Sequence, residues 1–118
     1  MNISIFQPAT NRPLFIDFDQ YTDGDADFKK ELIYLMIDNL KEAQMSLSEA
    51  IKKNKLDIFE KTCHKITPTL GMLDDKDLID SILSIKSQFS NSTEKDKLLN
   101  SFTTTCVQII KSLEKENR

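Results

Sequence analysis

His64 is the only histidine in the chain, and it is the strongest candidate for a chemically reactive side chain. An exposed imidazole that is partly neutral near pH 7 is a nucleophile. It can attack the acyl phosphate of a phospho-aspartate, hold the phosphoryl group on nitrogen, and pass it to another carboxylate. The sequence therefore offers one side chain suited to carrying a phosphoryl group.

Lys61, Lys65 and Thr67 are the local side chains that could offset the charge of such a group, through a cation or a hydroxyl donor. Around His64 the apolar residues recur at intervals of three and four: Leu56, Phe59, Cys63, Ile66 and Leu70. At about 100° per residue, His64 lies roughly 120° from the centre of that stripe. We therefore expect the imidazole to face solvent or a groove beside the core. A surface histidine with no function would have the same orientation.

Gly71 and Pro68 make the surroundings of His64 unusual. Gly71 lies two turns later on the same helix face, and its missing side chain leaves open surface beside the imidazole. Pro68 has no N–H for the His64 carbonyl, so we expect a kink there. Alternatively, the helix ends near Ile66 and a new turn begins at Pro68.

The elements that must position His64 are long amphipathic helices, because only two glycines and three prolines are available for turns. Apolar stripes of helical period cover residues 28–51, 56–70, 78–89 and 98–113. The first helix should begin near Asp25, with Asp74 as the cap of the third. These features predict an all-α fold, an up-down-up-down antiparallel four-helix bundle over residues 17–118.

An N-terminal arm, residues 1–16, precedes these helices. Pro8 and Pro13 oppose regular structure there, while its apolar residues could form an arm or short helix covering one end of the bundle. The alternation over residues 2–5 could instead mark a short strand.

The composition of this chain of 118 residues fits one domain, with a net charge of −3 and a pI near 5.1. This acidity argues against nucleic-acid binding, which favours a basic face. No apolar run could span a membrane, and no signal peptide is recognisable, so we expect a cytoplasmic protein. Cys63 and Cys106 fall on apolar stripes, which indicates reduced core residues.

Three stretches of the sequence carry a family resemblance: residues 28–33, 54–57 and 63–66. Over residues 17 to 115, the chain resembles the histidine-phosphotransfer (HPt) domain family, whose motif is close to Ala-His-x-Leu-Lys-Gly. Cys63 takes the small position, His64 the histidine and Ile66 the apolar position. Thr67 and Pro68 stand where the family has lysine and glycine.

The resemblance implies that His64 is the phospho-acceptor of a two-component phosphorelay, carrying the group between aspartates of receiver domains. The partner, a response-regulator receiver domain or a hybrid histidine kinase, would supply the catalysis, so the chain would be no enzyme and need no cofactor. Glu60, Pro68 and Gly71 would contact that partner. We expect a monomer.

Three other functions compete with this interpretation. Thr67 in place of lysine favours a degenerate HPt-like bundle that binds a receiver or kinase without being phosphorylated. A metal, haem or small-molecule site would have one histidine and two stripe-facing cysteines as ligands, which are too few. Hydrolysis would need a nucleophile–base pair, whereas the acidic run resembles a helix start: Asp74, Asp75, Asp77 and Asp80.

Overall fold

Helices are the only regular secondary structure between residues 12 and 117, the part of the chain that the computed structural model describes. They are α1 (Phe18–Thr22), α2 (Ala26–Lys52), α3 (Leu56–Leu73), α4 (Lys76–Ser87) and α5 (Ser92–Glu116). The all-α prediction is confirmed. Most of the predicted arm, including the short strand considered for residues 2–5, lies outside the described residues.

Side chains that accept hydrogen bonds from backbone N–H groups begin most of these helices. Asp25 caps α2, as predicted, by accepting from the Phe28 N–H at 3.0 Å. The prediction that Asp74 caps the third helix is wrong, because Asp75 caps α4. Asp74 instead ends α3 in the left-handed conformation, with φ of 50°.

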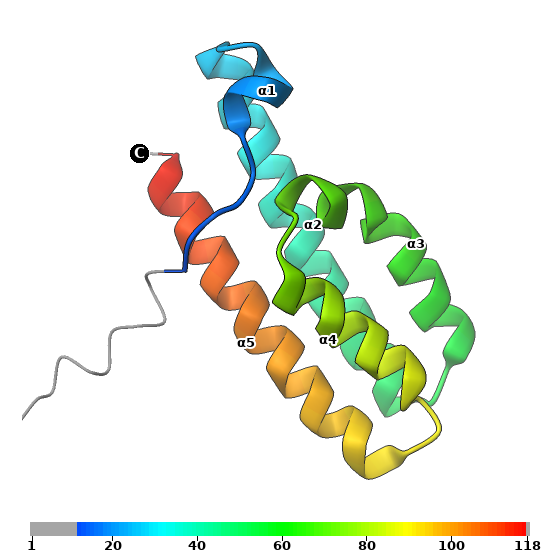
Figure 1. The fold of residues 1–118 in the computed structure, drawn as a ribbon. Helices are drawn as coiled ribbons and strands as arrows, with labels where there is room; N and C mark the ends of the chain where they lie inside the picture. Colours follow the sequence, from blue (N-terminus) through cyan, green and yellow to red (C-terminus); the bar gives the residue numbers. More distant parts are fainter. Residues whose placement is uncertain (1–11, 118) are drawn as a thin grey trace, which may run out of the picture.

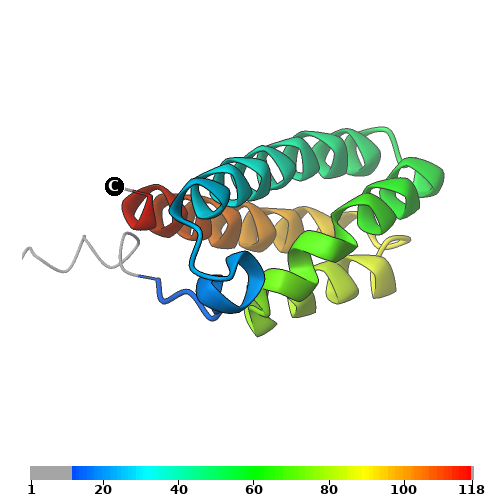
Figure 2. The ribbon, with the colours of Figure 1, turned by 90° about the horizontal axis from the view of Figure 1, so that it is seen from above.

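The four long helices lie side by side, and successive ones run in opposite directions (Figure 1). α2 packs against α3 and α5, while α4 packs against α5 and, less extensively, against α3. Figure 2 shows α2 beside α5 in the view from above. The short α1 packs on α2, far from the end where the α2–α3 and α4–α5 connections lie.

The core draws side chains from all four long helices, and many of them have no exposed surface. These include Ile33, Met36, Leu40, Leu47, Phe59, Leu78, Ile85, Phe102 and Cys106. Cys106 is thus the core residue that its stripe predicted, whereas Cys63 is only partly buried. Both cysteines are unpaired thiols.

Several residues assigned to apolar stripes are exposed: Phe28, Leu35, Leu56 and Leu83. α2 has 27 residues and α3 only 18, so the first third of α2 extends past the end of its partner. Leu35 lies one turn before Asn39, which donates a hydrogen bond to Thr69 near the end of α3. Phe28 and Leu35 therefore face outward where α3 no longer covers their side of α2.

α3 is continuous from Leu56 to Leu73 and contains Pro68 in its interior. The alternative in which this helix ends near Ile66 is therefore wrong. Because proline has no N–H, the His64 carbonyl lacks its usual helical donor, and the neighbouring turns must hold the helix together.

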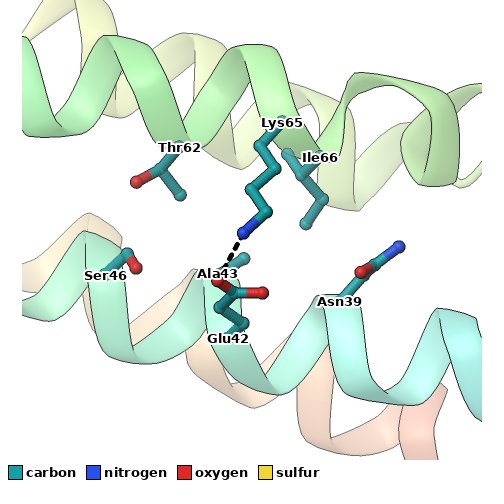
Figure 3. A pocket seen from close by; sticks show the side chains of 7 residues that line it. All are labelled: Asn39, Glu42, Ala43, Ser46, Thr62, Lys65 and Ile66. Carbon is teal, nitrogen blue, oxygen red and sulfur yellow. Dashed lines mark hydrogen bonds and ion pairs between the residues drawn. The ribbon is translucent and has the colours of Figure 1, made fainter.

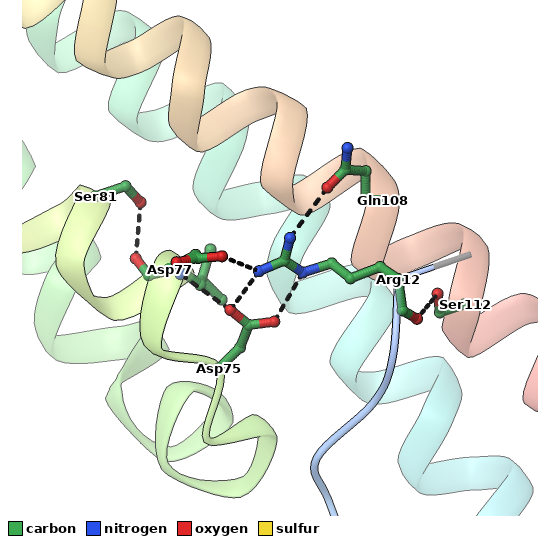
Figure 4. Close-up of polar contacts among 7 residues, drawn as sticks. Arg12, Asp75, Asp77, Ser81, Gln108 and Ser112 are labelled. Carbon is green, nitrogen blue, oxygen red and sulfur yellow. Dashed lines mark hydrogen bonds and ion pairs between the residues drawn. The ribbon is translucent and has the colours of Figure 1, made fainter. Parts of the chain in front are cut away.

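The described part of the arm is fastened to α4 and α5 through Arg12 (Figure 4). Its guanidinium donates twice to the Asp75 carboxylate, at 2.8 and 2.6 Å, and once to Gln108 at 3.1 Å. The Ser112 hydroxyl donates to the Arg12 carbonyl at 2.6 Å. Ile16 is buried and Leu14 packs against the core, whereas Pro13 and Phe15 are exposed, so alternate residues of this segment contact the helices.

Within residues 12–117, no helix is both long enough and apolar enough to cross a membrane.

Candidate functional site

His64 is exposed and lies at the middle of α3, on the side opposite the core. The buried residues of this helix are Phe59, Thr62, Ile66, Thr69 and Leu73. At about 100° per residue, the centre of that buried set lies roughly 180° from His64. The imidazole therefore points away from the protein more directly than the apolar stripe alone predicted.

The predicted partner contacts share the outward face of α3 with His64. Glu60, Pro68 and Gly71 are all exposed, and each lies within about 40° of the histidine around the helix. A Cβ atom added at Gly71 would meet no other atom within 4 Å. The glycine thus leaves open space beside the imidazole, although no neighbouring atom would exclude a side chain at this position.

Lys65, one of the predicted supporting residues, is directed toward α2 and away from His64. Its Nζ atom lies 2.6 Å from Oε2 of Glu42 (Figure 3). The pair borders a cavity of about 30 Å³ between the two helices, also lined by Asn39, Ala43, Ser46, Thr62 and Ile66. A space of this size holds about one water molecule, so we assign it no substrate.

Thr67 is also engaged locally, since its hydroxyl donates to the Cys63 carbonyl at 2.7 Å. Lys61, one turn before His64 and about 60° from it, is exposed. Among the described residues it makes no salt bridge. Of the three predicted supporting residues, Lys61 is therefore the one placed to reach a group on the imidazole.

Lys86 on α4 is a cation near Cys63, the residue before His64, and the sequence analysis did not identify it. Burial raises the pKa of the Cys63 thiol, while the nearby Lys86 charge opposes that rise and Glu60 adds to it. The Lys86 charge therefore acts on Cys63, the residue that precedes His64 in α3. Because it belongs to another helix, no local spacing in the sequence pointed to it.

The aspartates at the start of α4, Asp75 and Asp77, have a structural role. Burial alone would raise the pKa of Asp75, but hydrogen bonds from Arg12 and the Leu78 N–H hold it below its ordinary value. Asp77 pairs with the same arginine at 3.0 Å. Within the described chain, no three side chains of the types that bind metals are grouped as a metal site.

Comparisons with protein-family models, curated proteins and solved structures found no match to this chain. The interpretation of His64 therefore depends on its motif and on the geometry described above.

Proposed function

We propose that this protein is a phosphoryl carrier of the HPt type, in which His64 accepts the group from a phospho-aspartate of a receiver domain. The observation that carries the proposal is the position of the single imidazole, exposed at the middle of a long helix and opposite its buried face. Such a side chain can enter the active site of a partner without unfolding its own helix.

The transfer itself needs little from the carrier. A neutral nitrogen of His64 attacks phosphorus, the bond from phosphorus to the aspartate oxygen breaks, and the carboxylate leaves with the electron pair. Formation of the nitrogen–phosphorus bond is reversible, so the phosphoryl group can pass to a second aspartate. The partner supplies the metal ion and the catalytic groups, which makes this chain a carrier and not an enzyme.

The proposed architecture is an antiparallel four-helix bundle of α2, α3, α4 and α5. The alternating directions of these helices and their shared core support it. In this arrangement the inner face of α3 packs against the other helices. The outward face of α3 is then a rigid support for the histidine.

A receiver domain is the proposed partner, docking over His64 with Glu60, Pro68 and Gly71 as contacts. Leu35 is 54% exposed on α2 near the end of α3, and it would add apolar contact to a partner that extends past the end of this helix. Docking surfaces between proteins commonly combine such apolar residues with a polar rim. The Glu42–Lys65 pair between the two helices provides part of that rim.

A second candidate function is receiver or kinase binding without phosphorylation. The observation favouring it is that Lys65 and Thr67 both bond elsewhere, so neither is aimed at the imidazole. Lys61 then remains as the predicted supporting cation that can approach a phosphoryl group.

Label transfer from a phosphorylated receiver domain or hybrid kinase separates the two functions. The carrier function predicts that wild-type protein takes up acid-labile label. His64→Gln should fold equally well and take up none. Normal receiver binding by wild-type protein without any label would select the second function, and label on His64→Gln would show that the histidine assignment is wrong.

A further inference from the structure

Lys95 is a buried cation without a buried counter-charge. The residue is only 6% exposed, and its Nζ atom donates to Oδ1 of Asn54 at 2.8 Å. The same atom lies 4.7 Å from the centroid of the Phe89 ring. Within residues 12–117, no carboxylate lies within salt-bridge distance of this ammonium.

Asp75, the other buried charged residue in the described chain, has a counter-ion. The Asp75 side chain is 3% exposed and has Arg12 as its partner at 2.6 Å. Burying an ionised group without a partner is costly, because water no longer solvates it. The Lys95 ammonium could therefore pair with an anion, because no carboxylate of the described residues does so.

Lys95 is one of the residues that line an open cavity of about 440 Å³. This cavity lies where the α2–α3 and α4–α5 connections meet, and it is lined by Ile51, Lys52, Asn54, Ser90, Lys95 and Asp96. Lys95 uses one of its three donors on Asn54, and the Asn54 amide keeps its own NH₂ group. With the Ser90 hydroxyl and the Lys52 ammonium, donors outnumber the single carboxylate of Asp96.

We propose that this cavity binds a small phosphate-type oxyanion. Two lysines against one aspartate give the cavity an excess positive charge, and tetrahedral oxygens can accept hydrogen bonds from donors on several sides. Asp96 opposes the binding and favours anions small enough to stay beside Lys95. The site is distinct from the surface around His64 and does not depend on the proposed phosphotransfer.

Titration with inorganic phosphate, followed by amide NMR shifts at constant ionic strength with chloride as the balancing anion, tests the proposal. We expect saturable shifts centred on Asn54, Ser90 and Lys95. Lys95→Met keeps an unbranched apolar side chain but removes the charge, and it should weaken binding by about tenfold or more. Lys97→Met, which removes an exposed lysine two residues away, should bind as the wild type does.

Ser90→Ala provides a second variant at an exposed connection, in case Lys95→Met does not fold. It should weaken phosphate binding by a few-fold. Shifts that do not saturate, or that spread equally over all surface lysines, would overturn the proposal. Equal phosphate affinity in wild-type protein and in folded Lys95→Met would do the same.

Discussion

A phosphoryl group on His64 would meet fewer local cations than the neighbouring sequence suggests. Lys65 is adjacent along the chain, yet its ammonium pairs with Glu42 on α2. Thr67 stands where the HPt motif has lysine, and its hydroxyl donates a hydrogen bond to the Cys63 carbonyl. Sequence identified these residues correctly as neighbours, but it could not show where their polar atoms are engaged, because that depends on a second helix and on the local backbone.

Thr67→Lys should lengthen the lifetime of phosphohistidine. The new ammonium would lie one turn after His64 and attract the phosphoryl charge, an exposed interaction worth at most about 1 kcal/mol. Hydrolysis of the phosphorylated protein should therefore slow by up to about fivefold, as measured from loss of label over time. Thr67→Gln adds length without charge and should behave like the wild type. Equal slowing in both variants would show that charge is not the cause.

Asp75 illustrates a buried carboxylate that depends on its counter-ion. Its lowered pKa means that the ion pair with Arg12 stabilises the folded state fully above about pH 4, where the unfolded carboxyl is ionised. That stabilisation is lost as pH falls through the lowered folded value. Asp75→Asn retains a helix-capping side chain but loses the charge, and should reduce the free energy of unfolding by about 1–3 kcal/mol at neutral pH.

Chemical denaturation across a range of pH measures this effect. The difference between wild-type protein and Asp75→Asn should shrink as pH falls below about 4. Asp77→Asn, at a carboxylate that is 76% exposed, should change stability by no more than about 0.5 kcal/mol. A pH-independent deficit in Asp75→Asn would mean that the ion pair is not the source of its stability.

At the level of elements, α3 positions His64 although it contains Pro68, which removes one backbone hydrogen bond from the same helix. Pro68→Ala restores an N–H for the His64 carbonyl and should raise the free energy of unfolding by about 1–3 kcal/mol. Urea unfolding measures the change, with the exposed neighbour Thr67→Ala as the control. A loss of stability in Pro68→Ala would instead indicate that the proline ring packs against part of the protein.

The four long helices and most of their boundaries followed from the sequence, because apolar periodicity and the Asp25 cap are local signals. The five-residue α1 was not predicted, since it is too short to show a period. In α2, Ile33 and Ile37 are buried together with their neighbours Leu32 and Met36, so the buried face is wider than a single apolar stripe. A helix packed against two long neighbours buries a wider face than one stripe, so the stripe understated its core.

For the whole molecule, the contacts that sequence could not predict join distant segments. Arg12 and Asp75 are separated by 63 positions, and their pairing depends on how the arm reaches α4. Lys95 and Asn54 likewise meet only because two connections lie at the same end of the fold. Such contacts leave no periodic signal, whereas the outward direction of His64 needed only the spacing of α3 itself.

The exposed apolar residues bear on the expected oligomeric state. Exposed apolar residues occur on every described helix, for example Tyr21 on α1, Met45 on α2, Leu56 on α3, Leu83 on α4 and Val107 on α5. Scattered apolar residues of this kind are normal on monomers. Sedimentation equilibrium should therefore give the mass of one chain at micromolar concentration, and a concentration-dependent dimer would contradict this prediction.

Mapping the phosphorylated position tests the central claim most directly. After incubation with a phosphorylated receiver domain, peptide mass spectrometry at alkaline pH should find one phosphoryl group on His64, removed by mild acid. His64→Gln should remain folded, because the side chain is exposed and makes no core contact. Phosphate on any other residue, or none on His64 although the receiver binds normally, would contradict the account.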